Sequence, residues 1–481
     1  MLFHTGTFAI FFALFLACWL PARKRGGGPF VILAFSNLFY GWWNWKFLGL
    51  LWITILVDYS LARMLERTEA PGRRRLIVAA SLVSNLGILG FFKYYNFFLD
   101  GLGAAGVGAA AGWKLADLVL PVGISFYIFQ SLSYTIDVYR RQQKPVANLV
   151  EYAAFVCYFP QLVAGPIERL SHLLPQIAKP AAITPERILS GLLLFCGGYF
   201  RKGVADTIAT FVDPVFANPD ATLPMYMVLA IAAFGLQIYL DFTGYVDMAR
   251  GVSRAIGIDL MLNFDVPYTS LSIREFWRRW HISLSQWLRD YLYISLGGSR
   301  HGLPRHLAAL MITMLLGGLW HGAGLNFVIW GGLHGLYLCI HVLWERAKPG
   351  LPALPEGRAW RWAAGGLSWL LTWVAVNYAW LYFRAPTFEI ALAANRKVGQ
   401  WLLAPGIPPQ LTIIAMLLAA IAVIAAMDLR ARFRPEGAPD REPPLTAARA
   451  AGRGLLAGAY FAVGYVLLAG APTQQFIYFQ F

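Results

Sequence analysis

Residues 315–324 read LLGGLWHGAG and place a histidine, His321, between two apolar stretches at 306–320 and 325–345. A titratable side chain at membrane depth is costly to keep there, so such a residue is a candidate for function by default. The glycines around it allow helix backbones to approach closely or leave room for a cavity. We therefore expect a helical hairpin with a functional histidine at or near its top.

The composition is that of a polytopic membrane protein. Of the 481 residues, 58% are hydrophobic and 14% are charged, whereas an average soluble domain has roughly 25% charged residues. Apolar runs long enough to cross a bilayer as helices recur along nearly the whole chain. We expect an all-α fold in one integral-membrane domain over residues 1–481. The net charge of +15 fits basic cytoplasmic loops and contact with anionic lipids, so it does not indicate a nucleic-acid partner.

Hydropathy and charge together predict the topology. The expected spans are 6–21, 29–45, 47–62, 76–98, 119–138, 204–218, 224–248, 306–320, 325–345, 362–383, 411–427 and 453–472. Prolines break the apolar stretch 148–200, which is the pattern of a segment that enters the membrane and returns. Basic clusters follow alternate spans, which places them in the cytoplasm and both termini outside. The sequence therefore predicts a multi-pass membrane protein.

Residues 263–305 are too polar to cross a membrane and too aromatic for a solvated loop. We expect residues 274–291 to form one helix. Its apolar face would carry Phe276, Trp280, Leu284, Trp287 and Tyr291, and another face would carry Arg274, Arg278, His281, Ser285 and Arg289. Such a helix lies in the membrane interface, either as an anchor among headgroups or as a re-entrant wall of a cytoplasm-facing tunnel. In the second role its arginines would meet an anionic donor, since arginine binds phosphate bidentately.

Two histidines are the candidates for chemistry. A neutral His321 can take a proton from an alcohol while the alcohol oxygen attacks a carbonyl carbon. The alternative is a histidine that packs helices and bonds a neighbouring carbonyl. His281 lies 40 residues upstream and has either a catalytic or substrate-orienting role, or a solvated place at the interface.

Supporting polar residues are also visible. Gln237 and Asp241 are four residues apart and share a helix face. Asp241 would either orient a histidine or pair with an arginine of 274–289. Asn326 is either a helix-start residue or a site residue.

Signatures of other chemistries are absent from the sequence. There is no CxxC pair, no GxSxG elbow, no HExxH zinc helix and no P-loop. We therefore expect no metal and no tightly bound cofactor.

Six blocks, in this order, carry a resemblance to a known family. They are 93–98 (KYYNFF), 120–127 (LPVGISFY), 159–167 (FPQLVAGPI), 241–245 (DFTGY), 276–285 (FWRRWHISLS) and 476–479 (FIYF). With the Trp-His-Gly motif at 320–322, the chain resembles the membrane-bound O-acyltransferase family. Within that family it resembles the bacterial proteins that serve O-acetylation of exopolysaccharides such as alginate.

The resemblance implies a mechanism and an architecture. It makes His321 the active-site residue and places His281 in the same tunnel. Beside these two, the residues that we expect to support the site or bind the donor are Trp320, Trp280, Arg278, Ser285, Gln237, Asp241 and Asn326. It implies a ring of tilted helices around a central tunnel. A cytoplasmic thioester, either acetyl-CoA or an acylated carrier protein, would be the donor. A periplasmic acetyltransferase of the same pathway would be the partner, and the enzyme itself would lie in a bacterial inner membrane.

Two other functions remain open from the sequence. One is transfer of D-alanine or another acyl group to a cell-envelope polymer, as relatives in the same family do. The other, of a different class, is transport of a polysaccharide or a lipid-linked intermediate. No internal repeat is visible by eye, which disfavours transport, because many secondary transporters contain repeats.

Overall fold

The computed structural model describes residues 1–106, 113–115, 118–350, 357–406, 418, 421–422, 446–470 and 476–477. Every regular element within these residues is a helix, which confirms the predicted all-α class. The chain forms two compact units. Unit 1 contains Met1–Tyr199, Tyr245–Met261 and Leu445–Ala459, and unit 2 contains Phe200–Gly244, Leu262–Pro444 and Tyr460–Phe481. The single domain over 1–481 stays a prediction.

In the described part of the chain, eight helices are long and apolar enough to cross a membrane. They are Gly6–Arg25, Lys46–Glu66, Pro71–Ala104, Pro185–Ala217, Pro224–Ala255, Leu303–His321, Leu325–Gly350 and Ala447–Gly470. Seven of them coincide with predicted spans. The protein is therefore a multi-pass membrane protein.

The eighth helix, Pro185–Ala217, contains almost all of the span predicted at 204–218 but begins 19 residues before it, within the stretch 148–200 that was predicted to be broken. The earlier part of that stretch does break, into the short helices α7 (Leu149–Cys157), α8 (Phe159–Leu162) and α9 (Leu170–Ala178).

The other four predicted spans have different outcomes. The span predicted at 29–45 is the 17-residue helix α2 (Gly28–Asn44), and that at 119–138 is the 16-residue helix α6 (Ile124–Tyr139), most of whose side chains are buried. Both helices are shorter than an ordinary span of about 20 residues. The span at 362–383 lies in α16 (Arg358–Arg384), which is long but is not among the eight. The span at 411–427 lies almost wholly outside the described residues.

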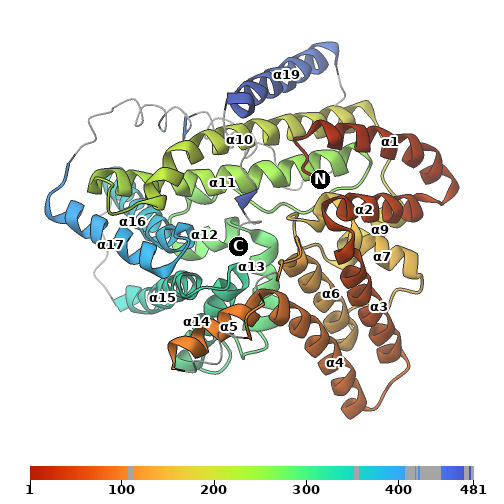
Figure 1. Ribbon diagram of the computed structural model, residues 1–481, viewed down its shortest axis with the longest axis horizontal. Helices are drawn as coiled ribbons and strands as arrows, with labels where there is room; N and C mark the ends of the chain where they lie inside the picture. The colour runs from red at the N-terminus through yellow and green to blue at the C-terminus, as the bar shows by residue number, and fades with distance from the viewer. Residues whose placement is uncertain are drawn as a thin grey trace. The chain divides into compact units, whose positions relative to one another are not determined.

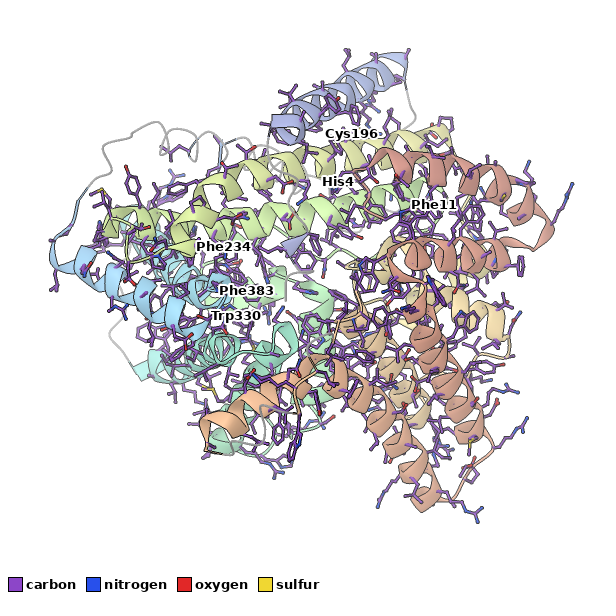
Figure 2. All side chains as sticks on the ribbon, viewed as in Figure 1. His4, Phe11, Cys196, Phe234, Trp330 and Phe383 are labelled. Carbon is purple, nitrogen blue, oxygen red and sulfur yellow. The ribbon has the colours of Figure 1, made fainter. Side chains whose placement is uncertain are left out.

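Aromatic packing joins the first helices of unit 1. Phe11 of α1 (Gly6–Ala22) is labelled in Figure 2, and its ring lies 5.6 Å from the rings of Phe35 and Phe39 and 5.3 Å from that of Phe159. On the opposite side of α1, Ile10 is 67% exposed. An apolar outer face and a buried aromatic face are what a lipid-facing helix needs.

A buried carboxylate joins three further helices of unit 1. Asp58 lies in α3 (Lys46–Glu66), which packs with α4 (Pro71–Leu89) and α6 (Figure 1). It is fully buried and accepts hydrogen bonds from Ser81 Oγ at 2.5 Å, Asn85 Nδ2 at 2.8 Å and Thr135 Oγ1 at 3.1 Å. Three donors compensate a charge that would otherwise be expensive to bury.

A close helix pair organises unit 2. Helices α14 (Leu303–His321) and α15 (Leu325–Ala347) run side by side (Figure 1). A Cβ atom on Gly318 would lie 2.3 Å from the carbonyl oxygen of Phe327, and one on Gly331 would lie 2.3 Å from that of Met314. Only glycine permits this backbone contact. The predicted hairpin with His321 at its end is confirmed.

The single helix predicted at 274–291 is wrong. The segment forms α12 (Ile273–Arg279) and α13 (Ile282–Trp287), followed by a π-helix at Leu288–Tyr293. Trp280 is extended and His281 is left-handed, so the chain turns between the two helices. Glu275 and Arg279, four residues apart in α12, form an ion pair at 2.7 Å.

Replacing Asp58 by alanine will destabilise unit 1 by about 2–4 kcal/mol, because three buried donors lose their acceptor. The measurement is the melting temperature of the purified protein in detergent. Glu66→Ala, at the exposed end of the same helix, is the control and will leave that temperature unchanged. Equal melting temperatures for the two variants would show that the Asp58 cluster contributes nothing to stability.

Candidate active site

His321 ends α14 inside an aromatic enclosure. Its side chain is almost fully buried. The imidazole centroid lies 4.9 Å from the ring of Trp320, 5.0 Å from that of Trp330 and 5.2 Å from that of Phe383. In Figure 2, Trp330 and Phe383 are labelled next to each other, on α15 and α16. Aromatic rings exclude water around the imidazole and restrict its orientation.

His281 occupies a strained turn. Its φ angle is 43°, in the left-handed region that is uncommon for residues other than glycine. Asn263 holds the turn, because its carbonyl oxygen accepts from Ile282 N at 2.9 Å and its Oδ1 accepts from Ser283 Oγ at 2.9 Å. Strain of this kind persists where the surroundings enforce it, and it is common at functional sites.

The two predicted histidines come together around Trp320. The Trp320 ring lies 4.9 Å from His321 and 6.1 Å from His281. On another side, His281 contacts the rings of Phe242 at 4.9 Å and Phe264 at 6.3 Å. Residues that are 40 positions apart in the sequence therefore belong to one cluster in unit 2.

Asp241 has a partner that the sequence interpretation did not name. Its Oδ1 lies 2.8 Å from Lys202 Nζ, which is also 2.7 Å from Asp206 Oδ1. Its Oδ2 accepts a hydrogen bond from the backbone N–H of Ile477 at 2.7 Å. The three charged side chains are buried. Neither pairing expected for Asp241, with an arginine of 274–289 or with a histidine, accounts for these contacts.

The residues next to this charged cluster also contact His281. Phe242 follows Asp241 and packs on His281, and its ring lies 5.7 Å from that of Phe476. The carboxylate of Asp241 thus holds the backbone at Ile477 beside the aromatic wall of the site.

The remaining predicted site residues occupy several places. Trp280 is buried against Phe276 and Trp380, at 5.5 and 5.1 Å. Ser285 closes the turn after it, donating from Oγ to the Trp280 carbonyl at 3.2 Å. Arg278 is exposed.

Two amide side chains complete the set. Gln237 lies one turn before Asp241 in α11 (Pro224–Ala255), and its buried Oε1 has no partner among the described residues. Asn326 donates from Nδ2 to the carbonyl of Ala385 at 2.8 Å and to that of Tyr382 at 3.2 Å. It therefore ties the start of α15 to the end of α16.

His334 is a candidate that the sequence interpretation missed. It is fully buried in α15, and its ring lies 4.8 Å from Trp330 and 5.0 Å from Trp277. It could have been found by the argument that singled out His321, since both histidines lie in apolar spans. The indole N–H of Trp330 is also buried, with no partner among the described residues.

The cluster is suited to moving a proton in an apolar site. Complete burial lowers the pKa of His281 from 6.5 to about 3, so its imidazole is neutral at physiological pH. Within the described residues, no group of three or more histidine, cysteine, aspartate or glutamate side chains is arranged to hold a metal ion. A neutral imidazole such as that of His281 can serve as a general base or as a hydrogen-bonding group.

Comparison with known proteins identifies the class. Residues 37–384 match the model of MBOAT, the membrane-bound O-acyltransferase family. The chain belongs to this family and is an O-acyltransferase.

Three bacterial proteins illustrate what the chain is similar to. The probable alginate O-acetylase AlgI of Azotobacter vinelandii is 40% identical over 89% of this chain and 85% of its own length. The peptidoglycan O-acetyltransferase of Helicobacter pylori is 36% identical over 74% of this chain and 71% of its own length. The teichoic acid D-alanyltransferase of Streptococcus thermophilus is 28% identical over 51% of this chain and 64% of its own length.

The buried His281 gives a pH dependence of stability. Because its folded pKa is depressed, only the unfolded chain takes up this proton as the pH falls below 6.5, and stability is lost from there down to about pH 3. Between pH 7.5 and pH 5 the wild type will lose roughly 2 kcal/mol more than His281→Phe, as the linkage relation requires. The measurement is the unfolding free energy of both proteins in detergent at the two pH values. Parallel losses would show that His281 is not held neutral by burial.

Proposed function

We propose that this enzyme transfers an acetyl group from a cytoplasmic thioester toward hydroxyl groups of an exopolysaccharide such as alginate outside the membrane. The names of its relatives support acetyl transfer, since the alginate and peptidoglycan acetylases cover more of this chain than the D-alanyltransferase does. The observation that carries the proposal is the cluster in which Trp320 contacts both His281 and His321.

His321 acts as the general base. It takes the proton from a hydroxyl group of the acceptor, which is the partner acetyltransferase or the polymer itself. At the same time the hydroxyl oxygen forms a bond to the thioester carbonyl carbon. The carbon–sulfur bond then breaks, and the proton passes to the departing thiolate. Acetyl ester and free thiol are the products, so no oxidant or metal is needed.

The surroundings determine how well this step works. The rings of Trp320, Trp330 and Phe383 keep water away from His321, which protects the thioester from hydrolysis. His281, held neutral and fixed by its turn, orients the reacting groups. We place these residues in a tunnel within a ring of tilted helices, open to the cytoplasmic donor, which is acetyl-CoA or an acetylated carrier protein. The partner on the other side is a periplasmic acetyltransferase that completes transfer to the polymer.

The proposal is tested with purified protein in lipid nanodiscs. Radiolabelled acetyl-CoA and acetylated carrier protein are supplied separately, with alginate oligosaccharide and the periplasmic acetyltransferase as acceptors. The wild type will transfer label, and His321→Ala will lower the rate roughly 100-fold or more, the typical contribution of a general base.

His306→Ala is the matched control, because His306 lies in the same helix but is partly exposed. It will leave the rate unchanged. Full activity in folded His321→Ala would overturn the proposed mechanism. No transfer from either donor by the wild type would overturn the proposed reaction.

A further inference from the structure

His334 carries a hydrogen-bond donor that the mechanism above does not use. The indole N–H of Trp277 donates to His334 Nδ1 at 3.3 Å. An imidazole that accepts at Nδ1 is neutral and carries its proton on Nε2. That Nε2 is buried and has no hydrogen-bond partner among the described residues. Buried donors are nearly always bonded, so a group absent from the described residues is expected to accept this one.

The position of His334 along the hairpin indicates which group that is. Gly331 packs against Met314 and Gly335 packs against Met311, so His334 lies at the level of these methionines. Met314 is seven residues before His321, which is about 10 Å of helix rise. His334 is therefore too far along the hairpin to share the reacting carbonyl, although the Trp330 ring contacts both histidines.

The basic residues at the far ends of the hairpin indicate from which side of the membrane the donor approaches His321. Arg305 lies at the start of α14, and Arg346 and Lys348 lie at the end of α15. Basic flanks face the cytoplasm. A donor that reaches His321 from the cytoplasm therefore passes the level of His334 first.

We propose that the Nε2–H of His334 donates a hydrogen bond to an amide carbonyl in the pantetheine-type arm of the acyl donor, and so holds the arm with its thioester at His321. The inference rests on the proposed function, since it assumes a thioester donor. The nearest amide of such an arm is separated from the thioester by two methylene groups, which matches a contact further along the hairpin.

The chemistry around His334 favours an uncharged acceptor. Its neighbours are the rings of Trp277, Trp330, Tyr337, Phe276 and Trp380, all of them uncharged. A phosphate or carboxylate would need compensating charge in such surroundings. An amide carbonyl needs only a neutral donor, and the rings suit the methylene groups on both sides of it. A plain hydrocarbon chain offers no acceptor.

The first experiment measures binding without turnover. The probe is an acetonyl thioether of coenzyme A, which has the pantetheine arm and cannot transfer its acyl group. His334→Phe keeps the aromatic packing and removes the donor, and it will weaken binding about tenfold, the effect of one neutral hydrogen bond. His334→Gln keeps an N–H donor and will stay within about twofold of the wild type. His341→Phe, two turns further along α15, is the matched control and will not change binding.

The second experiment separates a binding role from a structural one. Acetyl-CoA is compared with ethyl thioacetate, a thioester without an amide. His334→Phe will raise KM for acetyl-CoA while kcat changes little, and it will not alter kcat/KM for the short thioester. The double variant Trp277→Phe, His334→Phe removes the indole N–H that the single variant leaves without an acceptor. If the single variant folds poorly, the double variant is used in its place, and it will show the same tenfold loss of binding.

The outcomes are distinct. Unchanged binding of the thioether by folded His334→Phe overturns the inference. An equal loss of kcat/KM in His334→Phe and His334→Gln, with acetyl-CoA and with ethyl thioacetate alike, also overturns the inference, because His334 would then be structural. A wild type that binds the thioether through His334 but transfers no acetyl group supports the inference and overturns the proposed function.

Discussion

Gly318 of α14 and Gly331 of α15 let the two backbones of the hairpin touch, and the groups around His321 are placed by that contact. A methyl group at either position would meet a carbonyl oxygen at 2.3 Å and push the helices apart. Helix association in a bilayer depends on such close packing, because lipid supplies no hydrophobic driving force between helices. With the backbones in contact, Trp330 of α15 reaches the His321 ring at the end of α14.

Packing against aromatic rings determines where each imidazole in this region lies. His281, His321 and His334 each pack against tryptophan. The enclosure keeps His281 neutral, and Trp277 determines which nitrogen of His334 carries the proton. A neutral imidazole with a defined tautomer is more useful for acyl transfer than a charged one, since it can accept a proton or donate a hydrogen bond at a known atom.

Charged groups buried elsewhere are compensated by different means in the two units. Asp58 in unit 1 is surrounded by three neutral donors, which disperse its charge through hydrogen bonds. In unit 2, Lys202 lies between Asp206 and Asp241, and the backbone at Ile477 supplies a further donor. Removal of one partner from either cluster would leave a polar or charged group without a partner in an apolar environment, which would lower the free energy of unfolding strongly.

Local properties of the sequence determined the all-α class, most of the eight spans and the choice of His321 as a candidate, because hydropathy, helix length and a titratable residue in an apolar run are readable within a short window. His281 became a candidate through the aromatic and basic segment that contains it. Tertiary structure alone decided the rest. The helix expected at 274–291 breaks at His281 because Asn263 bonds the turn from outside that segment. Asp241 pairs with Lys202 of another helix, a partner that the sequence pattern did not single out. His334 joins the site because α12 brings Trp277 to it. Periodicity carries no information about such contacts, since they depend on which faces of distant helices meet.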